Sequence, residues 1–223
     1  MRKAAFFDVD GTLTTGNVWR CIMDYFKDHG ERRLTNAFYW AYHTPSYLLF
    51  KLGLISQSRF RHGWALHLPW FFRGYSLAQA DRVWDGVLAE YLPPLWRVDA
   101  RAILDEHRAA GDFIVLVSAG PTPLVERIAG ELGAHLGIGS DMVLRDGRYT
   151  GASGGVCQGA QKAAFARARL QAEGIAVNFA ASAAYADSSA DVELLELVGR
   201  PVALHADEHL RPIAEARSWE IIS

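Results

Sequence analysis

The sequence of 223 residues contains only two cysteines, Cys21 and Cys157, which lie far apart in it. Two distant cysteines provide neither the framework of a disulfide-rich secreted domain nor the closely spaced pairs of a zinc site. A reducing cytosol is the simplest compartment for such a chain, so we expect a cytoplasmic protein. The first apolar run, residues 4–7, ends at Asp8, so we expect no signal peptide.

The sequence also lacks an excess of either charge, because it contains 23 basic and 25 acidic residues, which give a net charge of −2. Without a cationic surplus we expect no nucleic-acid partner. Prolines number only 8, and half of the residues (50%) are hydrophobic. Such a composition excludes disordered and low-complexity classes and predicts a globular protein.

The chain has no long uninterrupted apolar run. Its most apolar stretch, residues 37–54, is broken by His43, Pro45 and Lys51, whereas a spanning helix needs about 20 apolar residues. We therefore expect no stable membrane insertion. We favour buried or interface-forming helices here; a weak contact with a membrane surface and a pocket for a substrate with an apolar tail stay open, as does a homodimer.

Residues 15–97 differ in composition from the rest of the chain. They hold 18 of the 26 aromatic residues and 10 basic against 6 acidic residues, whereas the remainder holds 13 basic and 19 acidic. Helical spacing of apolar residues, with stops at Gly30 and Pro45, predicts that this segment is helical. Ser76 is a predicted N-cap for a helix over residues 77–92, which Pro93 ends. We predict a helical insert of residues 15–97 within a second module of residues 1–14 and 98–223.

The second module alternates short apolar runs with amphipathic stretches, which is the pattern of βαβ units. The predicted strands are residues 4–7, 113–117, 180–186 and 202–204. The predicted helices are residues 99–110, 121–132, 160–172 and 190–198. Asp146-Gly147 favours a type I′ turn in a hairpin of residues 142–145 and 148–151. The fold class is α/β, with a Rossmann-like parallel sheet flanked by helices.

Four acidic residues follow two of the predicted strands. Asp8 and Asp10 stand at the end of the first strand, and Asp187 and Asp191 stand at the end of the strand that precedes residue 187. Ligands of parallel sheets bind beyond the carboxyl ends of the strands, and Gly11 allows a sharp turn there. Clustered carboxylates repel one another unless a cation is present, and oxygen ligands suit Mg²⁺. We therefore predict a magnesium site, although a lone Asp at such a place is commonly a turn or N-cap residue.

Ser118 and Lys162 complete the candidate site. Ser118 follows the strand of residues 113–117 and precedes a predicted helix, where a hydroxyl and free backbone N–H groups can bind an anion. Lys162 stands at a helix N-terminus, which the helix dipole disfavours for a cation, so a partner is expected. Each has an ordinary alternative, an N-cap serine and a solvated lysine. Together the six side chains supply a carboxylate nucleophile, a second carboxylate to move a proton, a Mg²⁺ site, and a hydroxyl and an ammonium group for phosphoryl oxygens. These are the groups that phosphoryl transfer requires.

The order Asp8-Val-Asp-Gly-Thr, Ser118, Cys157-Gln-Gly-x-x-Lys, Asp187-Ser-x-x-Asp resembles the haloacid dehalogenase-like (HAD) superfamily. It is most similar to subfamily IB, the branch that includes phosphoserine phosphatases. This resemblance implies a HAD-like core with an inserted helical cap. It also implies a Mg²⁺-dependent phosphatase that hydrolyses a small organic phosphomonoester through an aspartyl-phosphate.

The resemblance assigns roles to the candidate residues. Asp8 is the expected nucleophile and Asp10 the expected acid and base. Mg²⁺ is expected on Asp8, Asp187, the backbone carbonyl of Asp10, and Asp191 as a ligand or supporting acid. The expected catalytic residues are Asp8, Asp10, Ser118 and Lys162. The expected substrate-binding residues are Gly11, Thr12, Asn17, Ser118, Ala119 and Lys162.

Substrate identity stays open. Phosphoserine phosphatases of this branch place a Glu where this chain has Asn17, and an amide binds an ammonium group less well than a carboxylate does. Phosphoserine is therefore not favoured. The basic, aromatic insert suggests an anionic substrate with an apolar part, steered by Arg59, Arg61 or Arg73. For each arginine alone, a place on a solvated helix face is the ordinary alternative. A phosphotransferase and a non-catalytic sensor of phosphorylated metabolites are the alternatives. His62 and His67 are predicted to be structural rather than substrate-facing.

Overall fold

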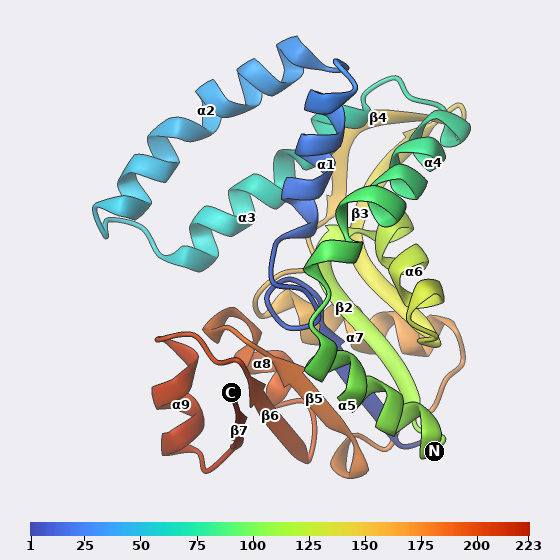
Figure 1. The fold of residues 1–223 in the computed structure, drawn as a ribbon, viewed down its shortest axis with the longest axis vertical. Coiled ribbons are helices and arrows are strands. Elements are labelled where there is room, and N and C mark those ends of the chain that lie inside the picture. The colour runs from blue at the N-terminus through green and yellow to red at the C-terminus, as the bar shows by residue number, and fades with distance from the viewer.

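The computed structural model of the protein describes residues 1–223, except for the side chains of Gln57 and Ser58. Across the described residues the strands form a single sheet in the order β4-β3-β2-β1-β5-β6-β7, with helices around it (Figure 1). All neighbouring strands are parallel except β3 and β4, which are antiparallel. The predicted α/β class with a parallel sheet is confirmed.

The central strands are buried apolar runs. They are β1 (Ala4–Asp8), β2 (Phe113–Pro121), β5 (Ala183–Ala186) and β6 (Arg200–Leu204), with β7 (Glu220–Ile222) at the edge. Successive side chains of a strand point to opposite faces. Phe7 accordingly packs on the face covered by α5 and α6, and Phe6 on the face covered by α7 and α8. The sheet is therefore covered by helices on both faces, as predicted.

Several boundaries differ from the sequence prediction. β5 begins at Ala183 rather than at residue 180, because Phe179–Ala181 forms a 3₁₀ turn in which Asn178 Oδ1 accepts a hydrogen bond from Ala181 N. β2 continues to Pro121, four residues beyond its predicted end. Local hydrophobicity did not indicate this extension, because it depends on pairing with β3 at Ser140.

The hairpin formed by β3 (Leu136–Arg145) and β4 (Arg148–Gly155) turns at Asp146-Gly147. Asp146 and Gly147 have φ angles of 50° and 71°, the two positive values that a type I′ turn requires. The predicted hairpin is confirmed, with longer strands than the sequence indicated.

Helices α5 (Val98–Ala109), α6 (Thr122–Glu131) and α7 (Gln161–Ala172) agree with the prediction within two residues at each end. The predicted helix of residues 190–198 is shorter: a 3₁₀ turn, Ser189–Asp191, leads into α8 (Val192–Leu195). The sequence analysis did not identify α9 (Leu210–Ala216) or β7. Both are short elements at the edge of the molecule.

Between β1 and α5 the chain is helical, with α1 (Val18–Asp28), α2 (Arg33–Lys51), α3 (Gln57–His67), the 3₁₀ turn Leu68–Phe72 and α4 (Leu77–Gly86). Ser76 caps α4 through a reciprocal pair of hydrogen bonds with Gln79, as expected of an N-cap. A π-helical turn, Val87–Tyr91, follows α4. Figure 1 shows α2 and α3 as a helical hairpin that projects away from the sheet.

Pro45 does not end a helix, contrary to the sequence prediction, because α2 continues through it to Lys51. The missing N–H of a proline costs one helical hydrogen bond. Packing on both sides of Pro45 offsets that loss: Tyr39 is buried against Trp64 of α3, and Phe50 stacks on Phe60.

The chain leaves and re-enters the sheet module through two adjacent segments. Thr15 N donates to Leu95 O at 2.8 Å, and Arg97 N donates to Leu13 O at 2.9 Å. These crossings lie at the predicted limits of the insert, and the division into two modules stays a prediction. None of the helices among the described residues combines the length and apolar character that crossing a bilayer requires.

Candidate active site

The loop after β1 brings its acidic residues to the carboxyl edge of the sheet. Asp8 ends β1, and the chain then turns sharply at Gly11, whose φ is +96°. A Cβ on Gly11 would lie 2.1 Å from Asp187 Oδ2. The turn therefore depends on glycine for both conformation and space, and it packs the first acidic loop directly against the loop after β5.

Asp8, Lys162 and Asp191 form a buried ion cluster. Lys162 Nζ lies 2.6 Å from Asp8 Oδ1 and 2.5 Å from Asp191 Oδ1, and each of these side chains is at most 5% exposed. Although burial alone would lower it, the pKa of Lys162 is raised by the neighbouring Asp191 and Asp8 carboxylates. Lys162 is therefore charged, and its expected partner is found.

Asp187 joins this cluster from the end of β5. Carboxylate oxygens of Asp8, Asp187 and Asp191 all lie within 4.8 Å of one another. Burial, and then repulsion from Asp8 and Asp191, raises the pKa of Asp187 to about 8. One lysine does not balance three such carboxylates, so this set of oxygen ligands fits a hard divalent cation. Thr12 Oγ1 donates to Asp8 Oδ2 at 3.0 Å and lies 3.2 Å from Asp187 Oδ1.

The carboxyl group of Asp10 lies apart from the three clustered carboxylates. Val18 N, at the start of α1, donates to Asp10 Oδ1 at 2.5 Å, and Ser118 Oγ lies 3.4 Å from Asp10 Oδ2. Burial, and then repulsion from Asp8, raises the pKa of Asp10 to about 6. A carboxyl group with such a pKa can gain and lose a proton near neutral pH.

Ser118 lies within β2 rather than just beyond it, which corrects the predicted end of this strand, whereas α6 begins at Thr122, close to its predicted start. The Ser118 side chain is fully buried, and its Oγ accepts a hydrogen bond from Gly120 N at 3.0 Å. The hydroxyl therefore joins the turn of β2 to Asp10. Extension of the strand to Pro121, rather than an early start of α6, gives this placement.

A cavity of about 240 Å³ opens above these residues. The expected residues Asp8, Asp10, Asn17, Ala119, Lys162 and Asp191 all line it. Asn17 precedes α1 but makes no side-chain cap hydrogen bond, so its amide is available to a ligand. Gly11, Thr12, Ser118 and Asp187 are not among the lining residues. Gly11 and Thr12 contact Asp187, and Ser118 contacts Asp10.

The opposite wall of the cavity comes from the helical insert and from residues to which the sequence analysis gave no role. Aromatic and aliphatic side chains dominate it: Trp19, Phe50, Phe60, Trp64 and Leu68. Arg61 is the arginine on this wall, whereas Arg59 and His62 are exposed. His67 lies 3.2 Å from His43 within the hairpin, in agreement with a structural role.

Three polar residues of the site were also missed. Gln158 lines the cavity, and its buried Oε1 has no partner among the described residues. Arg97 Nε donates to Gly11 O at 3.0 Å, and Ser188 Oγ donates to Asp191 Oδ2 at 3.1 Å. Gln158 and Ser188 stand inside the quoted motifs, which was the only signal available.

Residues 5–196 match the family described as haloacid dehalogenase-like hydrolase. The chain belongs to this family. The resemblance drawn from the spacing of the motifs is therefore confirmed, and so is the expectation of an enzyme.

Two relatives from Mycobacterium tuberculosis (strain H37Rv) carry phosphatase names. A probable phosphatase is 29% identical over 222 residues, covering 100% of this chain and 75% of the relative. Phosphoserine phosphatase SerB1 is 31% identical over 241 residues, covering 99% of this chain and 70% of the relative. Together with the family match, these similarities confirm the expectation of a phosphoric monoester hydrolase.

A crystal structure of a protein of unknown function from Bordetella pertussis Tohama I has the same fold. It superposes with a TM-score of 0.84 at 28% sequence identity, covering 100% of this chain and 99% of that chain. The arrangement of sheet and helical insert is therefore shared over the whole length of both chains.

Proposed function

We propose that the protein is a Mg²⁺-dependent phosphatase that hydrolyses a small organic phosphomonoester through an aspartyl-phosphate on Asp8. The observation that carries this proposal is the convergence of Asp8, Asp10 and Lys162 on one cavity, beside Asp187 and Asp191. A binding protein has no need of a buried carboxylate nucleophile next to a second carboxyl group that can transfer protons.

The reaction follows from the two carboxyl groups of the first loop. The Asp8 carboxylate attacks phosphorus, and the bond between phosphorus and the leaving alcohol oxygen breaks as Asp10 protonates that oxygen. Water then attacks the phosphorus of the aspartyl-phosphate, Asp10 accepts its proton, and the bond to Asp8 breaks to release phosphate. The raised pKa of Asp10, about 6, suits this alternation.

Asp8, Asp187 and Asp191 would hold Mg²⁺, together with the backbone carbonyl of Asp10. Bound there, Mg²⁺ would supply positive charge that offsets repulsion between the carboxylates and an anionic phosphate. Lys162 holds the Asp8 carboxylate in position through their ion pair. We propose that Lys162, Ser118 and the backbone around Gly11, Thr12 and Ala119 contact the phosphoryl oxygens.

The walls of the cavity favour a substrate that carries an apolar group. Trp19, Phe60 and Trp64 face the acidic floor, and Arg61 adds a cation to this wall. An anion with a flat or aliphatic part fits such a surface. Phosphoserine, suggested by the name of one relative, is disfavoured because Asn17 offers an amide where its ammonium group needs a carboxylate. We propose residues 15–97 as the cap over a core of residues 1–14 and 98–223.

The test is phosphate release from a panel of phosphomonoesters, with Mg²⁺ or with EDTA. We expect several esters with apolar groups to be hydrolysed only with Mg²⁺, and Asp8→Asn to be inactive. Asp105→Asn, which changes an exposed carboxylate on α5, is the matched control and should keep full activity.

Two outcomes would contradict the proposal. Transfer of phosphate to an added alcohol in preference to water would favour the phosphotransferase. A folded protein that binds Mg²⁺ but releases no phosphate from any ester would favour the sensor.

A further inference from the structure

The outer side of α2 is an exposed apolar surface. Six large apolar side chains on one side of α2 and at its C-cap are at least 41% exposed. They define the α2 face: Leu34, Phe38, Tyr42, Leu48, Leu49 and Leu52. Only Tyr39 and His43 of this helix are buried. Soluble monomers rarely expose so continuous an apolar stripe, and such a stripe marks an interaction surface.

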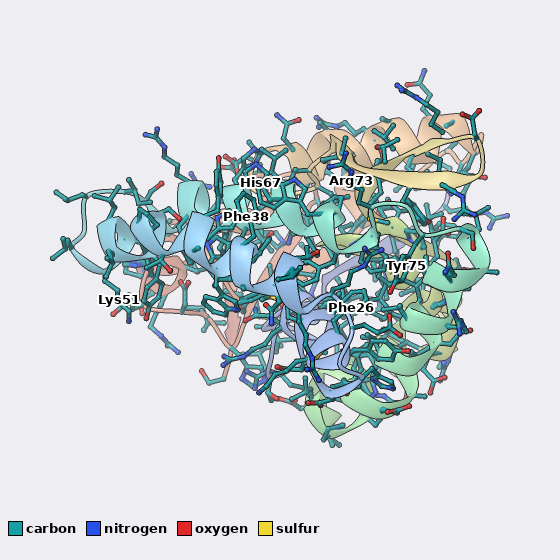
Figure 2. All side chains as sticks on the ribbon, turned by 90° about the horizontal axis from the view of Figure 1, so that it is seen from above. Phe26, Phe38, Lys51, His67, Arg73 and Tyr75 are labelled. Carbon is teal, nitrogen blue, oxygen red and sulfur yellow. The ribbon has the colours of Figure 1, made fainter. Side chains whose placement is uncertain are left out.

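The charged residues of the hairpin formed by α2 and α3 all have one sign. Between residues 32 and 80 the sequence contains no Asp or Glu, whereas it contains 6 Lys and Arg residues. Of these, Arg33, Lys51 and Arg59 are exposed on or beside the hairpin. Figure 2 shows Phe38 in the N-terminal half of α2 and Lys51 at its C-terminal end. A hairpin that carries basic but no acidic residues complements an anionic partner.

The chemistry of the α2 face matches a membrane interface. Leucines and aromatic residues that bury a few ångströms deep, flanked by Lys and Arg, are typical of helices that lie in the headgroup region. Trp40 and Tyr47 lie on the side of α2 that packs against Trp64 and Phe60 of α3, and both stay partly exposed. Such amphipathic rings prefer the interfacial depth. Lys51 Nζ lies 5.7 Å from the centre of the Tyr47 ring, where the amine can reach lipid phosphates.

A second copy of the chain is a poorer occupant. Pairing two α2 faces would bring Arg33, Lys51 and Arg59 of both copies together, with no acidic residue of the hairpin to neutralise them. Like charges across an interface cost affinity.

We propose that the α2 face docks the protein onto the surface of an anionic lipid bilayer, with α2 parallel to the membrane plane. This interaction requires no catalytic step, so the proposal can be tested independently of the proposed phosphatase activity.

Sedimentation of the full chain with vesicles tests this proposal. The vesicles contain either phosphatidylcholine alone or a mixture with phosphatidylglycerol. We expect the bound fraction to be about tenfold higher on the anionic vesicles and to fall as salt is added, since Lys and Arg near the surface contribute to binding. The double variant Leu48→Glu and Leu49→Glu should lose about tenfold or more of this binding.

Leu144→Glu is the matched control. Leu144 is 45% exposed on β3, beside the basic Arg145, and lies away from α2. This variant should bind vesicles as the unchanged protein does, and circular dichroism checks that both variants are folded. The proposal is overturned if the unchanged protein ignores anionic vesicles or if the α2 variant still binds them. It is also overturned if light scattering finds a dimer that the α2 variant dissociates.

Discussion

Buried charges of opposite sign hold the active-site residues in place. An unpaired ammonium or carboxylate would be costly inside the protein, and Lys162 satisfies Asp8 and Asp191 at once. The sequence analysis inferred that Lys162 has a partner, because its position at a helix N-terminus is otherwise unfavourable. It could not identify the partner, since Asp8 and Lys162 are separated by 154 positions.

Gly11 is the residue whose backbone the site depends on most. Gly11→Ala would place a Cβ 2.1 Å from Asp187 Oδ2 at a φ of +96°, so the two acidic loops must separate. Because misplacement of reacting groups by about 1 Å costs on the order of a hundredfold in rate, we expect at least that loss in kcat for phosphate release.

Gly147→Ala is the matched control for this substitution. Gly147 has a φ of +71°, but nothing lies within 4 Å of its added Cβ. This variant should lose about 1–2 kcal/mol of stability from the left-handed conformation and keep its kcat. Equal losses of activity in both variants would contradict the role assigned to Gly11.

At the scale of elements, α2 and α3 are joined by aromatic and histidine packing. His43 Nε2 lies 3.2 Å from His67 Nδ1, and His43 is in contact with Tyr39 and Trp64. Burial, and then repulsion from His67, lowers the pKa of His43 to about 4. The hairpin is therefore built around a neutral histidine pair.

This pair predicts that the hairpin weakens in mild acid. The pKa of His43 rises from about 4 in the folded protein to its ordinary value of 6.5 on unfolding. The contribution of neutral His43 to the stability of the hairpin is therefore complete above pH 6.5 and is lost as the pH falls toward 4. By pH 5 the loss approaches about 2 kcal/mol. Hydrogen exchange of α2 and α3 amides at pH 7 and pH 5 measures it.

His43→Gln keeps a neutral polar group and should show a flatter pH dependence between pH 7 and 5. His209→Gln, which changes an exposed histidine next to α9, should behave as the unchanged protein does. If the hairpin of His43→Gln weakens in acid as much as that of the unchanged protein, the histidine pair is not the cause.

At the scale of the whole molecule, the cavity joins parts of the chain that are distant in sequence. Its floor comes from the ends of β1, β2 and the loop after β5, and its wall comes from α1, α2 and α3. A cation held by Asp8, Asp187 and Asp191 would link the loops after β1 and β5. Metal binding should therefore stabilise the entire fold.

We expect a concentration of Mg²⁺ about 100 times its Kd to add about 2.7 kcal/mol to the free energy of unfolding. For a chain of this size, that raises Tm by about 5–10 °C. Differential scanning calorimetry with Mg²⁺ or EDTA measures the shift. Asp187→Asn should lose most of the Mg²⁺-dependent shift in Tm, and Asp105→Asn should keep all of it. An undiminished shift in Asp187→Asn would place the metal elsewhere.

Features that depend on a few neighbouring residues were predictable from the amino-acid sequence. Buried apolar runs predicted the central strands, Asp146-Gly147 predicted the hairpin turn, and the order of acidic motifs at strand ends predicted the family. These signals are readable because strand alternation, turn conformation and ligand position at the carboxyl edge of a parallel sheet each follow from a few neighbouring residues.

Other features became visible only in the tertiary structure, because they depend on contacts between segments that are distant in the sequence. Pairing with β3 extended β2 and placed Ser118 inside a strand, and packing on α3 carried α2 through Pro45. The same packing selected Arg61 over Arg59 for the cavity and buried Tyr39 while it left Phe38 exposed. Helical periodicity does not distinguish Tyr39 from Phe38, since only the position of α3 defines which side of α2 is covered.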